Sequence, residues 1–558
     1  GTFGDLYTMV LRRSGRAVPI ATDPMIYRLV QGAIEGLLVA GQIPHFAAIA
    51  STPGFIQTLV DRIAEFKRSR LFPGSLLDAT QDHGPGLVEI GRVYAAYQRL
   101  LEDAGWTDPE GLNWLAVEAL EQDDTPVRNI QLVVVDGFDS FNASQLAAIR
   151  LLGAAVPEVI VTLPGHPALP RPIHRRFTRA LNTLRSALPE AVLDEPLSDT
   201  RLPAPLAHLE AKLLESAGER IPAERNVAFL EARTPVDEAR EALRWIKARI
   251  VRDGLLPDEC ALVTPFPERY RPHLREAASE FGLPIRFTQG ESFAAAPGMV
   301  ALLDLLDLSS RNWPQGLTLA TIRSPYFNLE PFGLTRQHAD PLQLASLAGP
   351  VVEGLDQWQD TLNRLEQVDA PPPAEEEDLP AQPRLPIGPE ARILWESLRA
   401  FAERLTPPGP QPIHAWVRWL EDLLDDLCFF DQQQTEADQA SIAALRDTLR
   451  SLVLGEQVFG EQPSSFDTFI ADLHSNMEGA YLPDPLPWAQ PAILVLRVLE
   501  ARGIRLRALA LMGLSEGLFP EVEREDPFLR EAVRTELGLE PRLGREQAGL
   551  FYQAVTRA

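Results

Sequence analysis

A chain of 558 residues is longer than one hydrophobic core ordinarily supports, so we expect several domains. Its 52 lysines and arginines are outnumbered by 78 aspartates and glutamates, and the net charge of −26 argues against a uniformly basic nucleic-acid-binding surface while leaving room for a local basic groove. No apolar run reaches membrane-spanning length, no signal peptide opens the chain, and two cysteines are too few for a zinc site or an iron–sulfur cluster, which together favour a cytoplasmic protein without membrane attachment.

Helical periodicity fills the region from about residue 20 to residue 125. Apolar side chains recur at helical spacing in 55–63 and again in 93–101, a pattern typical of helices that pack in a core. The basic cluster of Lys67, Arg68 and Arg70 lies in the same region. Such clusters are usually solvated, and we interpret this one in that way rather than as a phosphate contact.

The stretch that follows begins with four apolar, mostly β-branched residues, Leu132–Val135. This run predicts a strand of a parallel sheet that is buried on both faces. Asp136 comes directly after it, at the strand end where open α/β sheets hold their ligands, and a carboxylate there suits a hydrated Mg²⁺. Alternatively, Asp136 and Gly137 form only the turn, and Asp139 or Asn142 caps the next helix.

A helix around 143–152 and a second buried strand over 159–163 complete a strand–helix–strand unit, which requires a parallel sheet. The turn 164–167 ends the second strand at the same sheet edge as Asp136. His166 in that turn is placed to touch a ligand, although a histidine between prolines is more often a loop residue. The arginines Arg175, Arg176 and Arg179 then form a second basic cluster.

A second α/β pattern starts near residue 227, and residues from about 312 to 488 are helical with proline-rich loops. The chain ends within a predicted helix, so we expect the parent protein to continue. The predicted elements of this second α/β domain are strands over 227–230, 260–264, 284–287, 493–496 and 508–512, and helices over 235–251, 273–281 and 546–558.

Lysine is rare, with only Lys67, Lys212 and Lys247 in the chain. A phosphate-binding P-loop needs a lysine directly after a glycine. None of these three lysines follows a glycine, so this chain contains no P-loop.

Several segments, in this order, resemble the motifs of superfamily 1 DNA helicases of the UvrD type, and together they cover essentially the whole chain. The segments are Thr2-Phe3 for the "TFH" segment, 132–146 for the second motif "VDExQD", 227–293 for the start of the second motor domain, 498–504 running to 513–520 for the fifth motif and the strand after it, and 550–558 for the sixth motif "LFYVAxTRA".

The departures from the family pattern concern catalysis. Helicases that hydrolyse ATP carry a glutamate after the motif-two aspartate to position the attacking water, and Gly137 stands there in this chain. The turn 164–167 lacks the third-motif glutamine, and Arg497 and Val498 replace the approach to the fifth motif that normally holds a histidine. We expect the P-loop to lie upstream of Gly1.

A helicase-like chain with a disabled second motif resembles the B subunits of AddAB (RexAB) helicase–nucleases, which are similar in form to RecC. The resemblance implies two RecA-like parallel-sheet domains, the P-loop NTPase-like fold of superfamily 1 helicases, with two mainly helical insertions. The implied boundaries are 1–20 with 126–226 for the first RecA-like domain, 21–125 for its insertion, 227–312 with 489–558 for the second, and 313–488 for its insertion.

The resemblance also implies site residues. Asp136 and Arg557 are remnants of the nucleotide and Mg²⁺ site, although Arg557 is equally suited to an interdomain ion pair. The motif residues are Asp136, Gly137 and Asp139 in motif two, Glu500, Arg502 and Gly503 in motif five, and Tyr552, Thr556 and Arg557 in motif six. Candidate DNA contacts, chosen by their position near strand ends, are Thr2, Thr162, Arg175 and Thr264.

Three functions follow from these observations. The first is a non-motor subunit that binds and guides DNA beside an AddA-like helicase–nuclease partner in recombinational repair. The second is an active ATP-dependent helicase, to which Gly137 is the main objection. The third is a protein scaffold for such a partner. We expect this chain to lack ATPase and nuclease activity and to hold no cofactor itself, with ATP and Mg²⁺ reserved for the full-length protein and a nuclease domain expected downstream.

Overall fold

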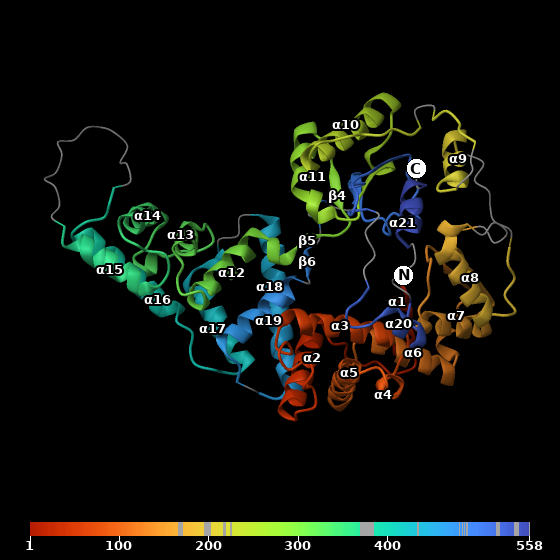
Figure 1. Cartoon of the computed structure of the whole chain (residues 1–558), viewed down its shortest axis with the longest axis horizontal. Coiled ribbons are helices and arrows are strands. Elements are labelled where there is room, and N and C mark those ends of the chain that lie inside the picture. The colour runs from red at the N-terminus through yellow and green to blue at the C-terminus, as the bar shows by residue number, and fades with distance from the viewer. Residues whose placement is uncertain are drawn as a thin grey trace.

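The computed structural model is a mainly helical α/β protein with parallel sheets (Figure 1), which confirms the α/β class. Helices α13–α16 extend to one end of the molecule, and the sheets lie toward the other. The structure describes residues 1–163, 165, 171–194, 202–215, 219–223, 226–368, 384–431, 435–461, 463–478, 480–482, 484, 486, 489–519, 525–540 and 546–556.

The first α/β unit is built around a two-stranded parallel sheet in which Leu132 pairs with Glu158 and Val135 with Val161. Helix α7 connects the strands, and its first turn is fixed by a capping box between Asn142 and Gln145. Asn142 rather than Asp139 is therefore the helix cap. The elements of this unit are α1 (Phe3–Arg13), α6 (Pro109–Gln122), β1 (Leu132–Val135), α7 (Ala143–Ala155), β2 (Glu158–Val161) and α8 (Arg175–Ala187).

The prediction that β1 and β2 are buried on both faces is wrong. Leu132 is 48% exposed, Val134 53% and Ile160 42%. The opposite face is covered, because Val133 and Val159 pack in the core formed with α1, α6 and α7. Apolar residues run through both strands, but in the described chain helices cover only one face of this small sheet.

The second α/β unit has a four-stranded, all-parallel sheet in the order β4-β7-β3-β8. Central strand β3 is completely buried, since it has a neighbour on each side and a separate core on each face. One core contains α10 and α11 side chains, and the other contains Ala554 of α21. The elements are α10 (Pro235–Asp253), β3 (Cys260–Val263), α11 (Pro267–Phe281), β4 (Ile285–Phe287), β7 (Ile493–Leu496), β8 (Ala508–Leu511) and α21 (Glu546–Val555).

The strand predicted over 227–230 does not form. Phe229 is 96% exposed and Leu230 50% exposed. In the described chain this segment joins no ladder, because β8 is the edge of the sheet and the segment makes no backbone hydrogen bonds to it. An apolar run without a paired neighbour is not sufficient for a strand. Helix α9 (Ala204–Lys212) precedes this segment.

The first helical unit contains α2 (Asp23–Val39), α3 (Pro53–Arg68), α4 (Pro73–Thr80) and α5 (Pro85–Ala104). Its core also includes Leu529 and Leu539, which come from a late segment, 525–540, that carries the short helix α20 (Glu531–Glu536). Two further ties hold this segment to α3: Arg62 pairs with Asp526 at 2.6 Å, and buried Arg534 pairs with Glu65. We call residues 525–540 the late strap.

The second helical unit has one large core that runs from Phe293 to Leu482. A short antiparallel ribbon of β5 and β6 connects it to the second α/β unit. Its elements are β5 (Glu291–Ser292), α12 (Pro297–Ser310), α13 (Gln315–Arg323), α14 (Ala339–Ala348), α15 (Leu355–Glu366), α16 (Pro389–Leu405), α17 (Ile413–Asp426), α18 (Glu436–Phe459), α19 (Phe466–Glu478) and β6 (Tyr481–Leu482).

Helix α21 joins the two α/β units, because it packs against β8 and also against α8 (Figure 1). No helix in the described part of the chain combines the length and apolarity that a membrane span needs. The predicted domain boundaries stay predictions, since hydrophobic cores alone do not fix where a domain begins or ends.

Candidate interdomain site at the end of strand β1

The loop after β1 sets the geometry of the site. Asp136 is exposed, and its Oδ1 accepts a hydrogen bond from the hydroxyl of Thr162, the residue after β2. The parallel register therefore brings these two predicted residues together at the carboxyl edge of the sheet. Gly137 then turns the chain with φ of +80°, a left-handed conformation that residues with a Cβ rarely adopt.

Asp139 is the centre of the site. Its side chain is only 4% exposed, and it is paired with two arginines: Arg502 Nη1 lies 2.6 Å from Oδ1 and Arg176 Nε lies 3.0 Å from Oδ2. Gln553 Nε2 donates to Oδ2 at 3.3 Å. We call Asp139, Arg176, Arg502 and Gln553 the Asp139 clasp.

The clasp connects the two α/β units. Asp139 and Arg176 belong to the first unit, from the loop after β1 and from α8, whereas Arg502 follows β7 and Gln553 lies on α21 of the second. A buried carboxylate needs strong donors to offset its loss of hydration, and here both Arg502 and Gln553 come from the other unit. Separating the units would leave Asp139 short of partners.

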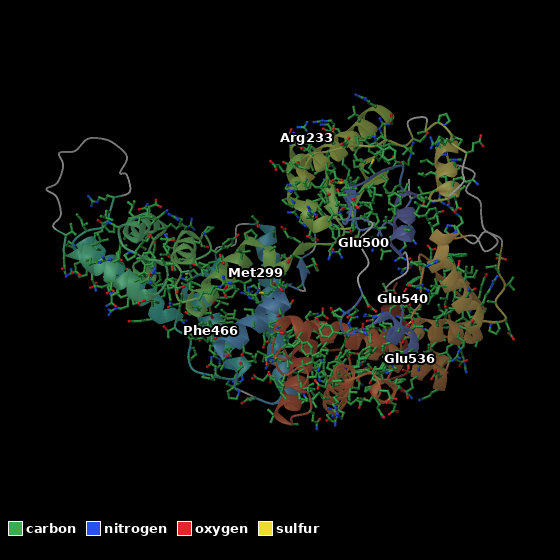
Figure 2. All side chains as sticks on the ribbon, viewed as in Figure 1. Arg233, Met299, Phe466, Glu500, Glu536 and Glu540 are labelled. Carbon is green, nitrogen blue, oxygen red and sulfur yellow. The ribbon has the colours of Figure 1, made fainter. Side chains whose placement is uncertain are left out.

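The remaining motif-five residues stabilise their own turn. Glu500 accepts the backbone N–H of Arg497 at 2.8 Å and the Thr288 hydroxyl at 2.5 Å. Gly503 has φ of +73° and is exposed, so it closes the turn. Figure 2 places Glu500 at the lower edge of the second α/β unit, at the opposite end from α10 in this view.

The described motif-six residues lie at the end of α21. The Tyr552 ring lies 5.2 Å from the ring of His174 and 5.4 Å from the Arg171 guanidinium carbon, both measured to the Tyr552 centroid. The Thr556 hydroxyl donates to the Tyr552 carbonyl at 2.8 Å, which closes the last helical turn. Arg557 lies outside the described residues, as does His166.

The four predicted DNA contacts are dispersed. Thr2 caps α1 in a capping box with Asp5, and Thr264 is completely buried after β3, where its N–H donates to the Leu496 carbonyl at 3.0 Å. Both roles are structural. Thr162 and Arg175 are exposed, the first beside Asp136 and the second at the start of α8.

The other basic cluster is also largely structural. Lys67 is completely buried, and its Nζ lies 2.7 Å from Asp108 and 2.8 Å from the Gln98 side-chain oxygen. The interpretation of this cluster as solvated is therefore wrong for Lys67, and Lys67 is not a phosphate contact either. Arg68 and Arg70 lie at the surface, each beside a glutamate.

The motif pattern does not single out Arg176 and Gln553. Arg176 is only one arginine of a cluster in the sequence. Gln553 could still have been noticed in the sequence, because it departs from the valine that the family's sixth motif, "LFYVAxTRA", has at that position. A polar residue at an apolar position of a packed helix needs a buried partner, and Asp139 is that partner.

The described residues do not fit a complete nucleotide–Mg²⁺ site. Asp136 is an exposed carboxylate in contact with Thr162, and no group of three possible metal ligands occurs in the described part of the chain. Asp139 is already occupied by two arginines.

Comparison with known sequences agrees with the motif resemblance. Residues 33–186 match the family described as ADDB, N-terminal. Over 98% of the chain, the sequence is 25% identical to the B subunit of the ATP-dependent helicase/deoxyribonuclease of Symbiobacterium thermophilum, of which it covers 50%. Proteins with the same name from Bacillus cereus (strain B4264) and Bacillus thuringiensis subsp. konkukian are 22% identical over the full chain, which covers 51% of each. The chain thus spans about half the length of the curated relatives it matches.

Proposed function

We propose, from the confirmed resemblance to the B subunits of AddAB-type helicase–nucleases, that this chain is a non-motor part of a complex that processes broken DNA ends in the cytoplasm. In this proposal its two α/β units are RecA-like lobes that no longer drive translocation. The chain guides DNA, and an AddA-like partner supplies ATP hydrolysis.

One observation carries the proposal: Gly137 occupies the place of the water-activating glutamate, in a left-handed conformation. An ATP-driven motor needs a carboxylate there to orient the attacking water. The next carboxylate along the loop, Asp139, is buried in the clasp and does not point into open solvent. The loop therefore lacks a free acid in the position that hydrolysis requires.

A motor also opens and closes the cleft between its lobes as nucleotide binds and leaves. The Asp139 clasp opposes that motion, because opening would strip Arg502 and Gln553 from a buried carboxylate. This supports a fixed pair of lobes. DNA guidance needs a surface that keeps its shape, and the proposed phosphate contacts are exposed Thr162, which bonds Asp136, and exposed Arg175, which precedes Arg176 of the clasp.

The test uses the full-length subunit in complex with its helicase–nuclease partner. The partner is inactivated by replacing its P-loop lysine, and ATP turnover is measured with single-stranded DNA. We expect no turnover above background, and we expect the Asp136→Asn variant to be indistinguishable from the wild type. Turnover that survives inactivation of the partner and disappears in Asp136→Asn would show an active helicase instead.

DNA binding separates guidance from a scaffold role. Electrophoretic binding of the full-length subunit to forked DNA is expected, and Arg175→Glu should weaken it by introducing a negative charge beside the phosphates. Arg450→Glu on α18 is the matched control, since Arg450 is an exposed arginine far along the chain from the clasp. A subunit that co-purifies with the partner but never binds DNA would support the scaffold function.

A further inference from the structure

The two helical units pack directly against each other, although they are separate insertions in the sequence. Helix α2 of the first unit lies along α18 and α19 of the second (Figure 1). These helices are more than 390 residues apart in sequence, so their contact depends entirely on the tertiary fold.

A buried ion pair lies in this interface. Arg28 Nη1 on α2 is 2.8 Å from Asp472 Oδ2 on α19, and the two side chains are 17% and 3% exposed. Arg28 is also held within its own helix, because its Nη1 donates to the Gln31 side chain at 3.1 Å. The guanidinium group is therefore oriented from its own helix as well as from across the interface.

Apolar contacts surround the pair. Met25 and Tyr27 of α2 are buried, and Gly455 of α18 lies opposite Met25, where a Cβ would approach to 3.8 Å of the Met25 Cγ. Apolar burial favours association but tolerates sliding, because it has no direction. An ion pair with both partners in the interface fits only one register.

We propose that Arg28 and Asp472 set the register of α2 on α18 and α19, so that the two helical units form one rigid body. A slip of one helical turn would displace α2 by about 5.4 Å and leave Asp472 buried without its arginine. The proposal concerns the shape of the subunit and does not depend on DNA binding. If the proposed function also holds, DNA surfaces on the two units keep a fixed spacing.

The test measures the distance between the two units in the full-length subunit. Spin labels are attached at Val39→Cys, at the exposed end of α2, and at Ile393→Cys, on the exposed face of α16, after replacement of Cys260 and Cys428. We expect one narrow distance distribution in the otherwise unchanged protein, with or without single-stranded DNA. A broad or two-peaked distribution would overturn the proposal, whether or not the protein binds DNA.

A double substitution tests the ion pair itself. Arg28→Met with Asp472→Leu keeps apolar volume in the interface and removes both charges, so the protein should stay folded with a thermal midpoint no lower than that of the unchanged protein while the distance distribution at least doubles in width. Arg450→Ala, which removes an exposed ion pair on α18, should leave the width unchanged. A narrow distribution in the double variant would show that apolar packing alone sets the register.

Discussion

The absence of a side chain at Gly137 has two consequences for the loop after β1. The position has no carboxylate, and its φ of +80° disfavours any residue with a Cβ. Space is not the obstacle, since no atom beyond Gly137 and its two chain neighbours lies within 4 Å of where a Cβ would be. The loop backbone therefore differs from one that could present a glutamate to a water molecule.

This difference predicts that Gly137→Glu restores no ATP hydrolysis to the subunit. The substitution should also cost about 1–2 kcal/mol of stability, because a side chain in the left-handed region is strained. Turnover in complex with an inactivated partner and the free energy of unfolding are the measurements. Gly137→Asn is the matched control and should cost less, since asparagine tolerates this conformation. Asp136-dependent turnover in the glutamate variant would contradict the prediction.

Asp139 gives a second prediction at the level of one residue. Asp139→Asn keeps the shape of the side chain but leaves Arg176 and Arg502 facing a neutral group, so we expect a loss of roughly 3 kcal/mol. Thermal unfolding measures the loss, and hydrogen exchange should rise in both α8 and α21. Asp340→Asn, which disrupts an exposed pair with Arg323, should change stability by no more than about 1 kcal/mol. Equal effects of the two substitutions would argue against the clasp.

Among the contacts between helices, that of α2 with α19 should make the stability of the protein depend on pH. Burial raises the pKa of Asp472 to about 6, and Glu35 contributes in the same direction, while Arg28 opposes both. The native state therefore holds this proton more tightly than the unfolded chain does. The contribution of Asp472 to stability is therefore largest at pH values below the ordinary aspartate pKa, and it is lost as the pH rises through about 6.

The stability difference between the wild type and Asp472→Asn should accordingly fall as the pH is raised from about 4 to about 7. The linkage relation limits this fall to about 3 kcal/mol. Urea unfolding followed at several pH values measures it, with a fluorescence probe on α2. Asp467→Asn removes an exposed carboxylate from the same helix and is the matched control. A difference that is constant over this range would contradict the prediction.

The elements also show how far sequence patterns reach. Strands β3, β7 and β8 are predicted correctly, because each is an apolar run that is fully or largely covered by neighbours. The run at 227–230 has the same pattern but forms no strand, and β1 is half exposed. A run of apolar residues indicates a preference for burial. Whether the run pairs with another strand, and whether helices cover it, depends on other segments of the chain.

The candidate site is predictable only in part. Asp136 and Asp139 are identified from one short stretch, and parallel pairing at the sheet edge is expected from the same region. The Asp139 clasp cannot be predicted from this stretch, because Asp139 and Arg502 are 363 residues apart in sequence. Motif spacing identifies residues within one segment, but it does not show which arginine from a distant segment reaches a given carboxylate.

At the scale of the whole molecule, the late strap links the end of the chain to its beginning. Leu529 is buried among the side chains of the first helical unit, and Phe528 lies 6.0 Å from the Phe46 ring centre and 6.2 Å from that of Phe55. Glu536 and Glu540, labelled in Figure 2, lie beside this unit. Glu540 also approaches Arg179 of α8 to 3.9 Å, so the strap touches both N-terminal units.

The strap predicts an effect at a distance along the sequence. Leu529→Ala should destabilise the first helical unit by about 3 kcal/mol, since it removes buried apolar volume from that core. Hydrogen exchange of α2 to α5 in the full-length subunit measures the effect. Leu514→Ala, at a half-exposed position, should change stability by no more than about 0.5 kcal/mol. Unchanged exchange in α2 to α5 would show that this unit is stable without the strap.

The strap also has a consequence for synthesis. Domains usually fold in order as they leave the ribosome, the N-terminal one first. Here α2 to α5 are made early, but Leu529 and Leu539 of their core are made only after the second helical unit and all four strands of the second sheet. Helices α2 to α5 therefore remain incompletely packed while more than 400 further residues are translated. During that interval the nascent chain exposes the apolar surface of α2 to α5 that the late strap later covers. We therefore expect chaperones to bind the nascent chain during translation.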